Sequence, residues 1–271
     1  MKKVFVLTLF GTPYDWAQEF IDHVQHLEQY GWYWKIFTPN ALESKGNVEI
    51  IPMTAEQFAD LTEKKLGVRP KMFITKLGVP SVHVTDFAIF TGLIFEDYLK
   101  DADFWGMTNW DVVYGRLDHF WPDSYLEDCD IFSDDTGVIN GVFCLFRNAG
   151  SLNRLCLTGN WQDIITQEPC RKCSGEGGIQ HDLYGSDEYG MTEEVKINPE
   201  IRFKYPQYYP MLSHDRLEQH VPDIKLSLKT DGSLWELFKD TNSPDWIHAR
   251  PFIGKEIPYF HFIRTKKWPQ L

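Results

Sequence analysis

The tripeptide Asn109-Trp110-Asp111 is the first candidate for chemistry, because it carries two oxygen-bearing side chains on either side of a tryptophan. In an extended segment such residues share one face, so both side chains can reach one ligand while Trp110 packs on the other side. This geometry suits a divalent ion that bridges a diphosphate, and we interpret the tripeptide as a clamp for a metal ion and a nucleotide. Asn and Asp are also common turn formers, which leaves an ordinary turn at a strand end as the alternative.

The cysteine pair Cys170 and Cys173 is the second candidate. With Cys156 and His181 it would supply enough ligands for a structural zinc ion, but the spacing to these outer residues matches no common zinc finger. A redox role is disfavoured because no helix start follows the pair to activate a thiol. The chain has five cysteines, an odd number scattered through apolar segments, which is typical of free thiols in a reducing compartment.

The residues before the tripeptide predict how it is positioned. Residues 104–108 are apolar and typical of a buried strand that delivers polar side chains at its carboxyl end. Residues 85–99 have helical spacing. At the start of the chain, a buried strand at 4–10, an amphipathic helix at 16–30 and a strand at 32–37 predict the parallel crossover unit of α/β proteins.

Further elements are predicted along the chain. Thr54 and Gln57 resemble a capping box that opens a helix at 55–66, and Gly67 would end it. We also expect strands at 48–51, 130–133 and 141–147 and a helix from Ser151 to residue 158. The acidic pair Asp134-Asp135 predicts a turn.

Residues 166–194 and 199–210 show little periodicity, and irregular segments of this length are more often functional loops than empty connectors. No internal repeat, low-complexity tract or linker divides the chain. We therefore predict one α/β domain over residues 1–271.

Composition narrows the function. The 271 residues are 43% hydrophobic, with ten tryptophans and twelve tyrosines, and such amphipathic rings suit ligands like sugars and nucleobases. The net charge of −12 argues against a general binder of nucleic-acid phosphates. No apolar run of about 18 residues occurs, and residues 1–10 lack the length and cleavage site of a signal peptide, so we expect a cytoplasmic protein without a transmembrane segment.

Several segments together resemble GT-A-type nucleotide-sugar glycosyltransferases, and in particular a group found in bacterial polysaccharide loci and large viruses. The resemblance covers approximately residues 1–195 and the last ten. It is most specific in the block from Asp103-Phe104-Trp105-Gly106 to Tyr114-Gly115 and at the late His261. The other matching segments are the strand-helix-strand opening, Asp86-Phe87, Phe95-Glu96-Asp97-Tyr98-Leu99, residues 141–148, Asp187-Glu188 and Phe260-His261-Phe262.

The resemblance implies a Rossmann-like GT-A fold with a mixed central sheet and helices on both faces. It implies a nucleotide-sugar-binding half at 1–120 and an acceptor-side half at 121–271 with a closing C-terminal strand. The activity would be transfer of a sugar from a nucleoside-diphosphate sugar to a hydroxyl acceptor, in glycan or polysaccharide synthesis. For a viral protein the location would be the host cytoplasm.

The resemblance also implies a ligand set. Asp111 and His261 would bind Mn²⁺ or Mg²⁺, with Asn109 in support, and an imidazole ligand favours Mn²⁺. Lys266, with Arg264, would hold phosphate oxygens, and Asp86 would contact the nucleoside. Each residue also has a structural alternative: His261 as a histidine packed in a strand, Asp86 as a charge favourable to a helix dipole, and Lys266 as a solvated cation.

An inverting transfer needs a carboxylate that takes the proton from the acceptor hydroxyl. The family places such a group where Asp187 and Glu188 stand in a glycine-flanked segment, and Asp187 is the first choice for the base with Glu188 second. Two solvated carboxylates on a loop are the alternative.

Two departures from the family pattern keep other functions open. Asn109 replaces the first aspartate of the usual Asp-x-Asp clamp, and His83 and Ala88 stand where lysines are usual near Asp86. A sugar- or nucleotide-binding module without turnover is therefore the alternative. A phage DNA-base glycosyltransferase is a third reading, disfavoured by the negative charge.

Overall fold

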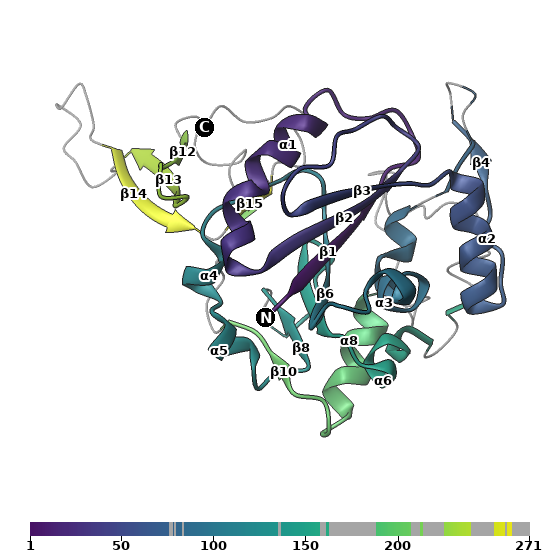
Figure 1. Ribbon diagram of the computed structural model, residues 1–271. Coiled ribbons are helices and arrows are strands. Elements are labelled where there is room, and N and C mark those ends of the chain that lie inside the picture. Colours follow the sequence, from purple (N-terminus) through teal and green to yellow (C-terminus); the bar gives the residue numbers. More distant parts are fainter. Residues whose placement is uncertain are drawn as a thin grey trace.

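A seven-stranded mixed sheet forms the centre of the computed structural model (Figure 1). Its order is β10-β8-β9-β6-β1-β2-β3, in which β9 runs antiparallel to both β6 and β8 and the other neighbours are parallel. This confirms the predicted α/β class with a mixed central sheet. The strands are β1 (Lys3–Thr8), β2 (Trp32–Thr38), β3 (Val48–Pro52), β6 (Phe104–Thr108), β8 (Ile131–Ser133), β9 (Phe143–Arg147) and β10 (Phe203–Lys204).

The structure describes residues 1–75, 78, 80–82, 84–134, 137–157, 161–162, 188–206, 212–213, 225–239, 252–257 and 259–261. None of the helices in these ranges combines the length and apolarity that a bilayer span requires.

Helices cover both faces of the sheet, as predicted. On one face, α1 (Ala17–His23) continues as the 3₁₀ helix η1 (Val24–Tyr30) and packs on Phe5 and Leu7 of β1. On the other face, α2 (Ala55–Leu66) and the segments after it pack with Val4 and Val6. The alternation of side chains along β1 thus supplies two cores, one for each face.

The helix predicted at 85–99 is three short segments: η2 (Val84–Phe90), α3 (Thr91–Ile94) and η3 (Glu96–Tyr98). This stretch is rich in β-branched and aromatic residues and also contains Gly92. All of these are weak helix formers. Gly92 is also needed for packing, because a Cβ there would lie 2.3 Å from the indole of Trp105.

The capping box of α2 is present as predicted. The Thr54 hydroxyl accepts a hydrogen bond from the backbone amide of Gln57 (3.1 Å), and the Gln57 side-chain oxygen accepts one from the backbone amide of Thr54 (2.8 Å). Gly67 ends the helix with a φ of 71°. The helix predicted from Ser151 is α6 (Gly150–Asn153) followed by η4 (Leu155–Leu157).

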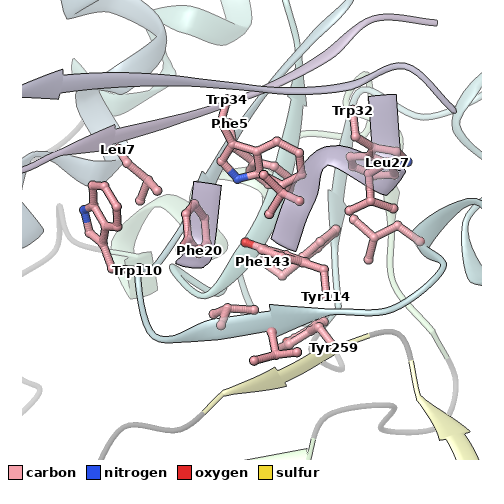
Figure 2. Close-up of a cluster of buried hydrophobic side chains, with 14 of the residues drawn as sticks. Phe5, Leu7, Phe20, Leu27, Trp32, Trp34, Trp110, Tyr114, Phe143 and Tyr259 are labelled. Atoms are coloured by element: carbon pink, nitrogen blue, oxygen red, sulfur yellow. The ribbon is translucent and has the colours of Figure 1, made fainter. Parts of the chain in front are cut away.

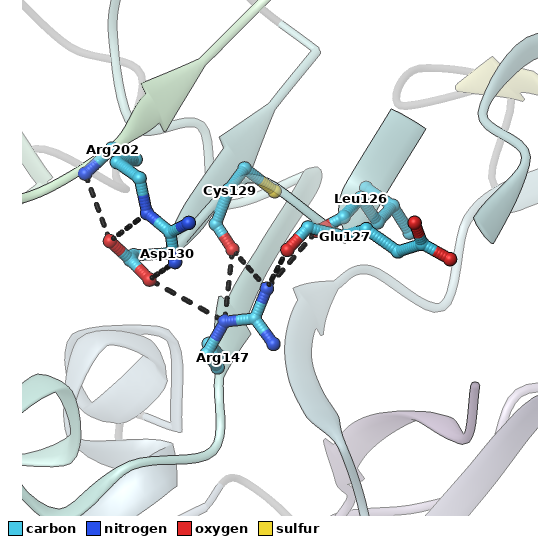
Figure 3. Close-up of polar contacts among 6 residues, drawn as sticks. All are labelled: Leu126, Glu127, Cys129, Asp130, Arg147 and Arg202. Carbon is cyan, nitrogen blue, oxygen red and sulfur yellow. Dashed lines mark hydrogen bonds and ion pairs between the residues drawn. The ribbon is translucent and has the colours of Figure 1, made fainter. Parts of the chain in front are cut away.

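Two arginines stabilise the sheet at the amino end of β8 (Figure 3). Arg202, next to β10, donates to the carboxylate of Asp130 at 2.7 and 3.0 Å. Arg147, at the end of β9, donates to the carbonyl oxygens of Cys129 and Glu127 at 2.7 Å. These contacts lie at the amino end of β8 and fix the order β10-β8-β9.

Smaller sheets lie beside the central one. β7 (Val112–Tyr114), β15 (Tyr259–His261) and β11 (Leu212–Ser213) form one of them, and β12 (Lys225–Leu228), β13 (Leu234–Lys239) and β14 (Phe252–Ile257) form another, which projects on the side away from α2 (Figure 1). Arg116 ties the second sheet to the body through Glu256, at 2.9 and 3.1 Å. The remaining elements are β4 (Phe73–Ile74), β5 (Pro80–Ser81), α4 (Leu117–Phe120), α5 (Asp123–Leu126) and α8 (Glu188–Ile197).

Candidate functional site

A cleft of about 500 Å³ opens where β1 and β6 separate. The two strands pair only from Lys3↔Phe104 to Phe5↔Gly106, whereas β1 stays paired with β2 as far as Thr8 and β6 stays paired with β9 as far as Thr108. The carboxyl ends of β1 and β6 therefore form the two lips of the cleft. From β1, the chain adds β2 and β3 on one side of the sheet and then β6 on the other side, so the strand order reverses between β1 and β6. Open α/β sheets bind ligands at such a switch point.

The cleft has an apolar wall and a polar wall. The apolar wall comes from α2, η2 and the residues around them: Phe58, Val82, Val84, Phe87, Ala88 and Phe95. The polar wall is formed by Thr8, Tyr14, Thr108, Asn109 and Asp111. Among the described residues that line the cleft, Asp111 is the one with a charged side chain, and no lysine or arginine is present.

Asn109 and Asp111 are half-buried and both line the cleft. Trp110 between them is buried against Phe20, with ring centroids 5.3 Å apart, and its Nε1 lies 3.4 Å from the Thr8 carbonyl oxygen (Figure 2). The tryptophan thus packs as the sequence predicts. The binding role of its two neighbours stays a prediction.

Tyr14 stands at the same end of the cleft. Its ring stacks on Trp16 at 4.6 Å with an interplanar angle of 4°, and 38% of the residue is exposed. Burial, and next the charge of Asp111, raise the pKa of the Tyr14 phenol. Tyr14 therefore stays neutral and offers a partly exposed aromatic surface beside the carboxylate.

Strand β7, which follows Asp111 directly, is held from the side of α1. The backbone amide of Tyr114 donates to Nε2 of His23 at 2.9 Å, and the Tyr114 hydroxyl bonds that of Thr108. Burial, and next the neighbouring His26, lower the pKa of His23 to about 3. His23 is therefore neutral at ordinary pH and can accept this hydrogen bond.

On its other edge, β7 pairs with the C-terminal strand β15. The register is Tyr259↔Tyr114, Phe260↔Val113 and His261↔Val112. The backbone of His261 thus lies across from the residue that follows Asp111. This pairing brings the ends of two predicted motifs together, although the His261 side chain is outside the description and its role as a metal ligand stays a prediction.

Comparison with known families adds an assignment. A family model described as "Family of unknown function (DUF6625)" matches residues 5–269. The chain belongs to the DUF6625 family. Among solved structures, an active-site mutant of LgtC is similar to this DUF6625 protein at 12% identity and a TM-score of 0.44, over 97% of this chain and 87% of that one. A search of curated proteins gave no match.

The other predicted residues of the DUF6625 chain are placed unevenly. Asp86 lies in η2, between cleft residues Val84 and Phe87, and Glu188 is the first residue of α8, but neither side chain is described. Other residues named in the sequence analysis lie outside the described ranges: Asp187, Lys266, Arg264, His83, Asp135, Cys170, Cys173 and His181. Cys129, Cys144 and Cys156 are buried. Within the described residues, no group of three or more His, Cys, Asp or Glu is arranged to hold a metal ion.

Two features were missed by the sequence reasoning. Tyr14 was not singled out, although an aromatic residue in the Gly-Thr-Pro turn after a buried strand is a usable signal. Asp134 was read as part of a turn, but its side chain is fully buried and its carboxylate accepts the Tyr259 hydroxyl and the Asn140 amide.

Proposed function

We propose that this protein is a metal-dependent glycosyltransferase that moves a sugar from a nucleoside-diphosphate sugar to a hydroxyl acceptor. The observation that carries the proposal is the cleft at the β1/β6 switch point, which Asn109, Asp111 and Tyr14 line together. The site combines oxygen ligands for a cation with an aromatic surface for a base or sugar. The sequence resemblance to GT-A transferases supports the same reading.

The charge of the cleft supports metal dependence. Asp111 carries a negative charge, and a divalent ion between this carboxylate and a diphosphate would offset the repulsion between the two. Oxygen atoms of Asp111 and Asn109 fit Mg²⁺ or Mn²⁺. The imidazole of His261, whose backbone pairs with that of Val112, is the proposed third ligand. When bound, the ion would stabilise negative charge on the leaving diphosphate.

The ring of Tyr14 supports the binding of a planar or ring-shaped group. Its stack on Trp16 fixes its orientation, so little side-chain entropy is lost when a ligand packs on it. The apolar residues of the cleft, among them Val82 and Phe87, would contact the remaining surface of such a group. Lys266 and Asp86 remain proposed contacts of the phosphates and the nucleoside.

The acceptor half of the site is proposed from the placement of α8. Strand β8 is parallel to β6, so its carboxyl end lies at the same edge of the sheet as the cleft. The amide of Ile139, in the segment after β8, donates to the Thr192 hydroxyl of α8 at 2.9 Å. This contact holds the first turns of α8 at that edge, which supports Asp187, or Glu188 at the helix start, as the base of an inverting transfer.

A binding module without turnover is the second candidate, favoured by Asn109 in place of a carboxylate. Donor hydrolysis separates the two functions, because many transferases slowly hydrolyse their donor when no acceptor is present. The protein should be incubated with Mn²⁺ and a panel of nucleotide sugars. Release of nucleoside diphosphate from one of them supports the enzyme, whereas binding without release supports the module.

A further inference from the structure

Strand β7 connects directly to Asp111, so whatever fixes β7 also fixes the proposed ligand. β7 has three residues, and its strand neighbour among the described residues is β15, which also has three. A ladder of this length is weak on its own. The side-chain contacts of β15 therefore contribute to its position, together with its pairing with β11.

Tyr259 supplies such contacts. It is fully buried, and its ring lies parallel to that of Phe143, at 5.4 Å with an interplanar angle of 10° (Figure 2). Across the ladder, the Tyr114 ring lies 6.4 Å away. The Tyr259 hydroxyl donates a hydrogen bond to the carboxylate of Asp134.

Asp134 belongs to the central sheet. It follows β8 directly, and its backbone amide donates to the Phe143 carbonyl oxygen at 3.3 Å. Its carboxylate is fully buried and accepts a second hydrogen bond from Nδ2 of Asn140 at 3.0 Å. The pair Asp134 and Tyr259 thus joins the central sheet to the C-terminal strand.

Burying a carboxylate here costs desolvation free energy, which an apolar pair of similar size would avoid. The carboxylate has one advantage over an apolar pair, namely that its hydrogen bond with Tyr259 requires a defined strand register. A shift of β15 by one residue would turn Tyr259 to the opposite face of the strand and leave Asp134 without this donor, at a considerable free-energy penalty. The hydrogen bond is therefore satisfied in one register.

We propose that the hydrogen bond between Asp134 and Tyr259 fixes the register of β15 on β7 and thereby holds the backbone of residue 261 across from Val112, the residue that follows Asp111. Both are positioning residues, since neither lines the cleft. The inference rests on the proposed function for its effect on ligand binding. Its structural part, the register of β15, stands on the contacts alone.

Tyr259→Phe is the decisive variant, because it keeps the stacked ring and removes the hydroxyl. Tyr125→Phe is the matched control: Tyr125 is half-buried on α5 and its ring packs edge-on against Phe132 at 5.8 Å. Calorimetric titration with uridine or guanosine diphosphate plus Mn²⁺, well below the melting temperature, should show about ten-fold weaker binding for Tyr259→Phe. The control should bind like the parent.

A bond that only adds stability would lower the melting temperature of Tyr259→Phe and leave the affinity of the folded protein unchanged, and that result would overturn the proposal. Asp134→Asn keeps an acceptor oxygen for Tyr259 and should lose less affinity than Asp134→Leu. Combining Tyr259→Phe with Asp134→Leu should cost little more than either change alone.

Hydrogen exchange separates this inference from the proposed function. Tyr259→Phe should lose amide protection at residues 112–114 and 259–261 and keep it in β1 and β2. If the parent binds neither nucleotide with Mn²⁺, the proposed function fails and the exchange result alone decides the register. Unchanged protection in both strands would contradict the proposal.

Discussion

Asp111 is the residue on which the proposed metal site depends, because it is the charged side chain among the described residues of the cleft. Asp111→Asn should weaken Mn²⁺-dependent binding of a nucleoside diphosphate by about ten-fold or more, since an amide is a poorer cation ligand than a carboxylate. Asp128→Asn, at an exposed aspartate, is the control. The Tyr14 pKa should also fall in Asp111→Asn while remaining above its ordinary value, because burial is the larger cause of its rise. Parent-like binding by Asp111→Asn would remove Asp111 from the metal site.

Tyr14 gives a second prediction. Tyr14→Ala should weaken nucleotide binding by roughly 5- to 100-fold, the usual effect of losing one stacked base, and Tyr14→Phe should bind like the parent. Tyr205→Ala removes another exposed tyrosine and should have no effect. The same affinities in Tyr14→Ala and the parent would show that the ligand does not stack there.

Asp187, which lies outside the described residues, gives a kinetic prediction. If it is the base, Asp187→Asn should reduce turnover by roughly 10²–10⁴ and change donor affinity little. The comparison requires initial rates and donor titrations for Asp187→Asn and Glu188→Gln. A large loss in the glutamine variant alone would move the role to Glu188.

The residues of the site differ in how far the sequence could predict them. Residues 109–111 form a bend between β6 and β7 rather than an extended segment, and all three line the cleft. The burial of Trp110 was predictable, because a large aromatic side chain between two buried strands usually packs in the core. The burial of Asp134 was not, because an acidic pair after a strand usually marks a turn and its partner Tyr259 is distant in sequence. The side-chain positions of Asp86, Glu188 and His261 stay predictions.

At the scale of elements, local signals were reliable and long-range pairings were not. The capping box of α2 and the opening strand-helix-strand unit depend on neighbouring residues and were predicted. The ladder between β7 and β15 joins two short strands from distant parts of the chain, and no periodicity could reveal it. That ladder nevertheless brings the predicted motifs of Asp111 and His261 together.

The contact of α1 with β7 makes a prediction about pH. The pKa of His23 is about 3 in the folded protein and about 6.5 in an unfolded chain, so below pH 6.5 the unfolded state binds the extra proton. Stability should therefore fall as the pH falls from 6.5 towards 3, by about 1.4 kcal/mol per pH unit for this group.

His23→Gln keeps an acceptor for the Tyr114 amide and should show a shallower dependence of the unfolding free energy on pH. Urea denaturation at several pH values measures this slope, and His119→Gln, at an exposed histidine, should keep the slope of the parent. Equal slopes for His23→Gln and the parent would contradict the neutral, buried state of His23.

At the scale of the whole molecule, the sheet explains why Asn109 and Asp111 line one cleft together with Tyr14. Strands β1, β6 and β8 run parallel and end at the same edge, and the apolar wall of α2 and η2 closes one side. The α/β class was predictable from the opening strand-helix-strand unit, whereas the mixed sheet was implied by the family resemblance. The single-domain assignment and its division at residue 120 stay predictions.

The most direct test of the central claim is the melting temperature of the full chain with uridine or guanosine diphosphate, measured with Mn²⁺ and with EDTA. Ligand at 100 times its dissociation constant stabilises the folded state by about 2.7 kcal/mol, which should raise the melting temperature by roughly 5 °C or more. We expect this rise with Mn²⁺ and none with EDTA. An equal rise in EDTA would show that the diphosphate binds without a metal ion and would contradict the proposed role of Asp111.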